Sequence, residues 1–160
     1  MESTEIEGNK AALDGGVFYL KNLDYHQLIF EKVTFKSNVC GNYGDTIYFN
    51  SSVRSDKLAS LDAIGASRRR LATVPAATLA KKRAITIQQS TFASPSGHNQ
   101  IYMDKIEFID VNKNTFSTMI DTQSLYGAGI MCVDCYTATF TGNEFKGQKA
   151  LIQGGGLYLK

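Results

Sequence analysis

One phrase recurs five times along this chain, and it limits the folds that the chain can adopt. Each copy starts with turn-forming residues and continues with an apolar residue, a central residue that is tyrosine in four copies, and a second apolar residue. The copies lie at 15–20, 44–49, 98–103, 127–132 and 154–159. Such alternation is typical of a strand with one buried face. Its recurrence predicts a repeat protein built from short strands.

The spacing of the copies defines the repeat. Their first apolar residues are 29, 54, 29 and 27 positions apart. A second phrase, two alternating apolar residues followed five positions later by phenylalanine, occurs once in every interval, including the long one. We therefore predict four rungs plus the opening of a fifth. The second rung would carry an insertion at 54–83.

Short strands at a nearly constant period, with no helical stretches between them, favour a solenoid. We predict an all-β chain forming a right-handed parallel β-helix, because strands in successive rungs pair in parallel and parallel connections are almost always right-handed. Residues 1–160 would form a single segment of a longer solenoid. A β-sandwich of antiparallel hairpins is the alternative, but it does not predict the same two phrases in the same order.

The alternation also assigns side chains to columns that run from rung to rung. One inner column contains Phe18, Ile47, Ile101, Ile130 and Leu157, and the next contains Leu20, Phe49, Met103, Cys132 and Leu159. An aromatic stack on another inner wall contains Phe35, Phe92, Phe116 and Phe145. An outer ladder contains Tyr19, Tyr48, Tyr102 and Tyr158, with Met131 in the remaining place. These tyrosines are a candidate surface for stacking sugars or receiving a partner's strands, unless they simply reflect the strand propensity of tyrosine.

Charge is concentrated in the insertion. The chain has a net charge of +2, which is too small to predict a nucleic-acid partner. Eight basic and two acidic residues lie within 54–83, including every arginine. We expect a solvated basic loop, compatible with a short helix at 56–66; an acidic partner, a membrane surface or a processing protease could use it. No apolar stretch is long enough for a transmembrane segment.

Two motifs carry a family resemblance. Gly127-Ala128-Gly129-Ile130 and Phe35-Lys36-Ser37-Asn38 resemble the Gly-Gly-Ala-Ile and Phe-x-x-Asn repeats of chlamydial polymorphic outer-membrane proteins. More broadly, the chain resembles the pectin-lyase-like superfamily of right-handed parallel β-helices. The asparagine is missing after the other three phenylalanines of the stack. The resemblance implies a surface, adhesive or wall-associated protein, at the cell surface or outside the cell, although the acidic N-terminus lacks a signal peptide.

Two functions follow as expectations. The first is a structural or adhesive segment that acts through its lateral faces and open ends, by self-association or with a protein partner. The second is carbohydrate binding or polysaccharide degradation, which the resemblance also implies. An enzyme of that kind needs clustered carboxylates; Asp104 and Asp134 are the best acidic pair, and the predicted scaffold holds no arginine. This balance favours a protein that is not an enzyme.

Cysteines and histidines predict no metal site and no cofactor. Cys132 and Cys135 are a lone C-x-x-C pair, and His26 and His98 fall on other rungs. Cys132 is either a buried thiol in its inner column or bonded to Cys135, and the bond requires a turn at Val133-Asp134. Asn50-Ser51-Ser52 matches a glycosylation acceptor for a secreted chain.

The last copy of the phrase, at 154–159, reads as the first strand of an unfinished rung. An uncapped β-helix exposes strand edges that invite pairing. We therefore expect this rung to be continued by further chain or completed by a neighbouring molecule.

Overall fold

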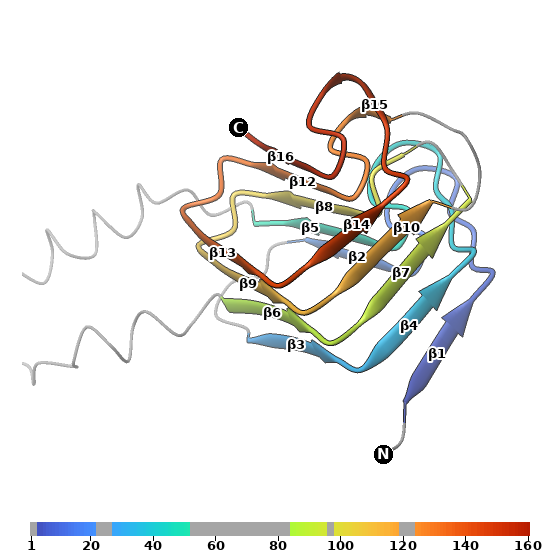
Figure 1. Ribbon diagram of the computed structural model, residues 1–160, viewed down its shortest axis with the longest axis horizontal. Coiled ribbons are helices and arrows are strands. Elements are labelled where there is room, and N and C mark those ends of the chain that lie inside the picture. The colour runs from blue at the N-terminus through green and yellow to red at the C-terminus, as the bar shows by residue number, and fades with distance from the viewer. Residues whose placement is uncertain (1–2, 22–26, 52–83, 96–97, 119–123) are drawn as a thin grey trace, which may run out of the picture.

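The computed structural model describes residues 3–21, 27–51, 84–95, 98–118 and 124–160. These residues form an all-β structure with parallel sheets and contain no helix (Figure 1). Parallel pairing excludes the antiparallel sandwich for this part of the chain. The predicted insertion at 54–83, with its short helix at 56–66, lies outside the described residues.

The strands form three large sheets and one pair. The phenylalanine sheet has the order β1 (Thr4–Glu7), β4 (Val33–Lys36), β7 (Thr91–Ser94), β10 (Thr115–Thr118) and β14 (Glu144–Lys146). The tyrosine sheet has the order β2 (Phe18–Lys21), β5 (Ile47–Asn50), β8 (Ile101–Asp104), β12 (Ile130–Val133) and β16 (Leu157–Leu159). The threonine sheet has the order β3 (Leu28–Glu31), β6 (Ala84–Gln88), β9 (Phe108–Asn112) and β13 (Thr137–Thr141). The remaining pair is β11 (Ser124–Tyr126) with β15 (Ala150–Gln153).

Consecutive strands belong to different sheets, in a repeated order. β5, β6 and β7 lie in the tyrosine, threonine and phenylalanine sheets in turn, and β8, β9 and β10 follow the same order. Equivalent strands from successive repeats therefore lie side by side (Figure 1). Because each side chain on a central strand then lies between its equivalents in the two neighbouring repeats, the sequence repeat becomes a spatial repeat.

The register confirms the predicted columns. Phe18 pairs with Ile47, Ile47 with Ile101, Ile101 with Ile130, and Ile130 with Leu157. The next inner column and the outer tyrosine positions follow the same ladder. Inward residues of the middle strands are buried and outward ones are half-buried, as strand alternation requires. The period-two pattern therefore predicted both faces of this sheet.

The aromatic stack is also confirmed. The ring centroids of Phe35 and Phe92, of Phe92 and Phe116, and of Phe116 and Phe145 are each 4.9 Å apart, with interplanar angles of 19°, 8° and 11°. The first three rings are fully buried. Inner residues from all three large sheets join them in one core, so the stack runs along the inside of the structure.

Each corner from the threonine sheet into the phenylalanine sheet begins with one residue in a left-handed backbone conformation. This residue has a left-handed backbone at Lys32, Gln89 and Lys113, with φ of 55°, 52° and 53°, and at Gly142, with φ of 61°. Non-glycine residues rarely adopt this conformation. The same corner conformation is nevertheless used four times. At three of these corners the left-handed residue continues the hydrogen bonding to the next repeat: the amides of Lys32, Gln89 and Lys113 donate to the carbonyls of Gln88, Asn112 and Thr141.

Buried amides support the same corners from inside. Oδ1 of Asn114 accepts a hydrogen bond from the Ser90 amide at 2.9 Å, and its Nδ2 donates to the Ile87 carbonyl at 2.8 Å. Oδ1 of Asn143 accepts from both the backbone amide and Nδ2 of Asn114 at 3.0 Å. These bonds satisfy backbone groups that a tight corner would otherwise bury unpaired.

Candidate functional site

The predicted tyrosine ladder forms along the outer face of the tyrosine sheet. The centroids of Tyr19 and Tyr48 are 4.9 Å apart with an interplanar angle of 24°, and those of Tyr48 and Tyr102 are 5.0 Å apart with an angle of 13°. Met131 follows Tyr102 in the register, and Tyr158 follows Met131. The structure therefore stacks the first three tyrosines and separates Tyr158 from them.

Stacking determines which parts of these rings a ligand can reach. Each ring in the stack covers the face of the next, so edges and hydroxyls remain for a ligand, and Lys21 Nζ lies 5.0 Å from the Tyr19 ring centroid. Burial raises the pKa of Tyr48 and of Tyr102, and the nearby carboxylates of Asp14 and Asp104 act in the same direction. These two hydroxyls therefore stay protonated at neutral pH and can both donate and accept hydrogen bonds.

The predicted acidic pair does not occupy equivalent positions. Asp104 ends β8 and is aligned with Val133, whereas Asp134 lies one position further on, exposed and with φ of 51°. Nδ2 of Asn50 donates to Oδ2 of Asp104 at 2.6 Å, and Lys105 Nζ lies 3.5 Å from the same oxygen. The Asp104 carboxylate is thus held by its neighbours on the tyrosine sheet.

The predicted glycosylation acceptor lies at the end of β5. Nδ2 of Asn50 is the atom that would carry a glycan, and it is the donor in the hydrogen bond to Asp104. Ser51 is buried, and Ser52 lies outside the described residues.

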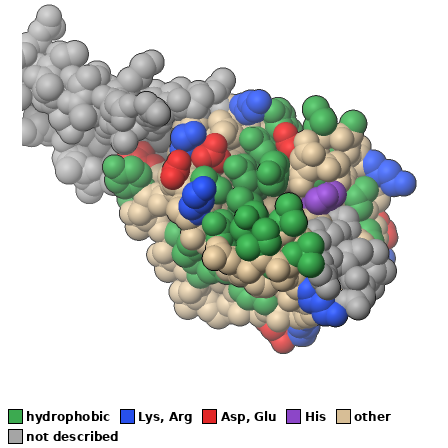
Figure 2. Space-filling model, turned by 90° about the horizontal axis from the view of Figure 1, so that it is seen from above, with side chains coloured by type: hydrophobic (Ala, Val, Ile, Leu, Met, Phe, Trp, Pro, Cys, Tyr) green, Lys and Arg blue, Asp and Glu red, His purple; other side chains and the backbone are tan. Residues whose placement is uncertain are grey.

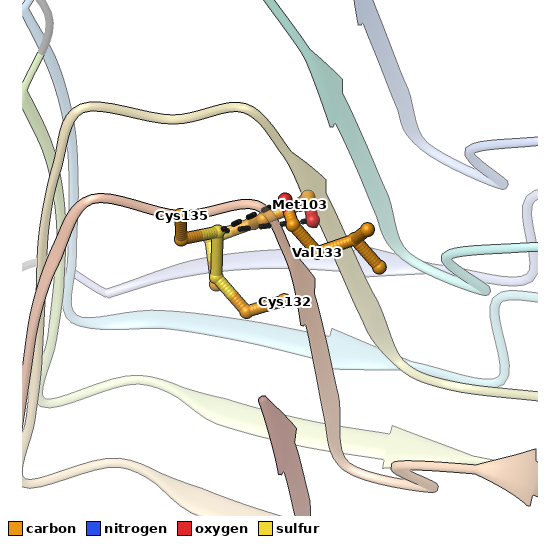
Figure 3. Close-up of a disulfide and its surroundings, with 4 residues drawn as sticks. All are labelled: Met103, Cys132, Val133 and Cys135. Atoms are coloured by element: carbon orange, nitrogen blue, oxygen red, sulfur yellow. Dashed lines mark hydrogen bonds between the residues drawn. A yellow bond between two sulfur atoms is a disulfide. The ribbon is translucent and has the colours of Figure 1, made fainter. Parts of the chain in front are cut away.

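Cys132 and Cys135 form a disulfide, with Cα atoms 6.0 Å apart. The turn that this bond requires is present, because Asp134 adopts φ of 51° directly after β12. Cys135 Sγ lies 3.6 Å from the Val133 carbonyl oxygen and 3.9 Å from that of Met103 (Figure 3). An oxidised sulfur has no hydrogen to donate, so these are packing contacts; a reduced Cys135 thiol could donate to either oxygen.

Apolar side chains are exposed where the sheets end. β13, β14, β15 and β16 are each outermost in their sheet order, so the last repeat presents its edges together. In one inner column, Phe49, Met103 and Cys132 are fully buried, whereas Leu159 is 55% exposed. We call the exposed group Tyr136, Leu151, Ile152 and Leu159 the apolar end face. Figure 2 shows the molecule from above, relative to Figure 1, and hydrophobic side chains gather in the middle of that surface.

A shallow hollow lies on the outer side of the threonine sheet. Outward side chains of β6, β9 and β13 line it, including Thr86, Phe108, Asp110 and Thr139. Its lining offers one aromatic ring, three threonine hydroxyls and a single carboxylate. The sequence did not predict this hollow, because its shape depends on how the strands twist.

Sequence reasoning missed a cluster of Cys40, Asp45 and His98, whose ligand atoms all lie within 4.8 Å of one another. Oδ1 of Asp45 accepts a hydrogen bond from the Cys40 amide at 3.0 Å, and Oδ2 accepts one from the Ser94 hydroxyl at 2.7 Å. Nδ1 of His98 lies 3.7 Å from Oδ1 of Asp45. Burial, and then the Asp45 carboxylate, raise the pKa of the Cys40 thiol to about 12.

The sequence does carry a signal for this cluster. Counted back from the paired strands, His98 takes the place that glycine holds at 15, 44, 127 and 154, and the position of Asp45 holds Gly16, Asn99, Ala128 and Gly155 in the other copies. Two side chains of this cluster therefore stand where most copies have a small residue. Comparing the copies position by position would have found them.

Comparison with protein-family models, curated proteins and solved structures finds no match to this chain. Within the described ranges, no helix has the length and apolar character needed to cross a membrane.

Proposed function

We propose that the chain is a right-handed parallel β-helix of four rungs and the opening of a fifth. We further propose that it serves as a structural or adhesive segment of a larger surface or extracellular assembly. Support for the architecture comes from the fixed order in which the chain visits its three large sheets and from the continuous registers between repeats. Right-handed connections are the rule for parallel strands.

One observation supports the proposed function: the exposed residues of the apolar end face lie in the last repeat, whose strands are at the edges of their sheets. Leu151 and Ile152 are 62% and 57% exposed, on β15 at the edge of its pair. Parallel strand edges present amide and carbonyl groups to an incoming strand, and apolar side chains add a hydrophobic contact. We propose that this face joins the β-structured surface of a second copy of the chain, which continues the sheets and covers these side chains.

Association should be measured by analytical ultracentrifugation over a range of protein concentrations. Covering the exposed parts of Leu151 and Ile152 contributes about 1–2 kcal/mol for each residue. Leu151→Lys or Ile152→Lys should therefore weaken association about 5- to 30-fold. The matched control is Ile29→Lys on β3, because Ile29 is 58% exposed but lies on the outer side of the threonine sheet at its other edge.

The control should associate like the unmodified protein. A chain that remains monomeric at every concentration would contradict the proposal. So would an Ile29→Lys variant that loses association as strongly as Ile152→Lys.

The hollow on the threonine sheet favours a second candidate function, carbohydrate binding or polysaccharide degradation. Phe108 offers an aromatic ring for a sugar face, and Thr86, Thr139 and Asp110 offer hydrogen-bonding groups. Calorimetry with acidic and neutral polysaccharides would test it: Asp110→Ala should abolish binding, whereas Glu31→Ala, an equal charge change at the edge of the same sheet, should not. Turnover of a polysaccharide that is blocked by Asp104→Ala would overturn the structural proposal.

A further inference from the structure

Three side chains that commonly bind metals converge beside the tyrosine sheet. Cys40 lies in the segment between β4 and β5, Asp45 lies two residues before β5, and His98 lies three residues before β8. One ligand atom from each lies within 4.8 Å of the other two. The thiol and the carboxylate thus come from the segment between β4 and β5, the imidazole comes from the segment before β8, and the three groups lie close together.

The burial of Asp45 indicates that this point has an electrostatic role. Asp45 is fully buried, and Cys40 is 7% exposed. A buried carboxylate is costly unless a positive charge or a metal ion balances it. The Cys40 amide and the Ser94 hydroxyl donate hydrogen bonds to this carboxylate, and a cation bound between the carboxylate, the thiol and the imidazole would balance its charge.

We propose that Cys40, Asp45 and His98 bind Zn²⁺ or a similar divalent transition metal. The thiolate, the carboxylate and Nδ1 would be its ligands, and a water molecule would complete four-coordination. Zinc accepts sulfur, nitrogen and oxygen ligands together, whereas Mg²⁺ and Ca²⁺ require oxygen ligands. On binding, the Cys40 thiol releases its proton to solvent and the sulfur lone pair forms the bond to the metal.

The distances suit this site after a small contraction. With zinc bonds of about 2.0–2.3 Å, tetrahedral ligand atoms lie about 3.3–3.6 Å apart. The separation between Nδ1 of His98 and Oδ1 of Asp45 is already 3.7 Å. The His98 side chain is 42% exposed, so it has room to adjust. The hydrogen bond from Ser94 to Oδ2 would orient the carboxylate, as groups around a metal ligand commonly do.

An ion pair between protonated His98 and Asp45 is the competing explanation, and a metal titration separates the two. The probe is Co²⁺ alone, because a bound thiolate gives an intense sulfur-to-cobalt absorption band that an ion pair cannot produce. The protein is kept free of reductant, so Cys132 and Cys135 stay in their disulfide. Cys40 is then the one thiol available in the chain.

We expect one equivalent of Co²⁺ to produce this band, Zn²⁺ to displace the cobalt, and Mg²⁺ to have no effect. Cys40→Ser should abolish the band, and His98→Ala should weaken cobalt binding at least about 10-fold, a loss seen even for groups that only support metal ligands. The control is His26→Ala, which removes the chain's other histidine and should change nothing.

Circular dichroism should confirm that each variant is folded. If Cys40→Ser fails to fold, the half-exposed His98 still allows the test. The proposal is overturned if the unmodified protein gives no thiolate band, if the band survives in Cys40→Ser, or if His26→Ala removes it.

Discussion

Replacing Phe116 by alanine tests the aromatic stack most directly. Phe116 is fully buried and has ring partners on both sides, Phe92 and Phe145, each with its centroid 4.9 Å away. Phe145 is chemically the same but half-buried, and its ring stacks only on Phe116 in the described structure. The two positions differ in burial and in the number of stacked neighbours, so they form a matched pair.

The expected cost follows from these contacts. Losing a buried phenyl ring forfeits up to about 3 kcal/mol of transfer free energy. A residual cavity of about 100 Å³ adds about 2 kcal/mol, because the stacked neighbours are held by their own strands and cannot collapse into it. Phe116→Ala should therefore lower the free energy of unfolding by about 4–5 kcal/mol, and Phe145→Ala by about half as much.

Urea unfolding followed by circular dichroism and tyrosine fluorescence would measure both costs. The chain contains no tryptophan, so tyrosine is the intrinsic reporter. Because about 5 kcal/mol can exhaust the stability of a domain, Phe116→Leu, with an expected cost of about 1–2 kcal/mol, should accompany it. Equal costs at Phe116 and Phe145 would refute the idea that two-sided stacking stabilises this core.

Two further predictions concern buried polar groups. Asn114→Leu should destabilise the fold by about 2–4 kcal/mol in the same urea assay, because it leaves the Ser90 amide and the Ile87 carbonyl without their side-chain partner. The control is Asn112→Ala, two residues earlier on the outer side, which should lower the free energy of unfolding by less than about 1 kcal/mol. Burial raises the pKa of the metal-free Cys40 thiol to about 12, above the value of about 8.5 in the unfolded chain. The protonated thiol therefore contributes to the stability of the fold below about pH 8.5, and this contribution is lost as the pH rises toward 12. Iodoacetamide at pH 8.5 should therefore modify Cys40 in urea but not in the folded protein, and equal labelling rates would contradict this.

Strand alternation made the inner and outer columns predictable. In parallel strands that pair with their own equivalents, a residue's neighbours across the sheet are the same position in other repeats. Phe18, Ile47 and Ile101 could thus be aligned from spacing, and the register agrees. The four stacked phenylalanines were predictable for the same reason.

For the candidate sites, the sequence predicted which positions were involved but not the geometry of their side chains. The tyrosine ladder was expected from alternation, but the stacking that covers its ring faces depends on side-chain rotation. Asp104 and Asp134 were predicted as the best acidic pair, and the register offsets their positions by one residue. The Cys132–Cys135 bond depended on the left-handed turn at Asp134, which no local pattern required.

By itself, then, the sequence determined the strands within its two repeated phrases, the faces of those strands and their stacking partners, because these depend on a period that neighbouring residues share. Tertiary structure alone decided how the chain turns between sheets, which apolar residues remain exposed on the end face, and that Cys40, Asp45 and His98 meet. These features depend on backbone corners and on contacts between residues far apart in the chain. The repeat specifies which strands pair with one another, but the backbone conformation of the corners decides which side chains of the connecting segments come into contact.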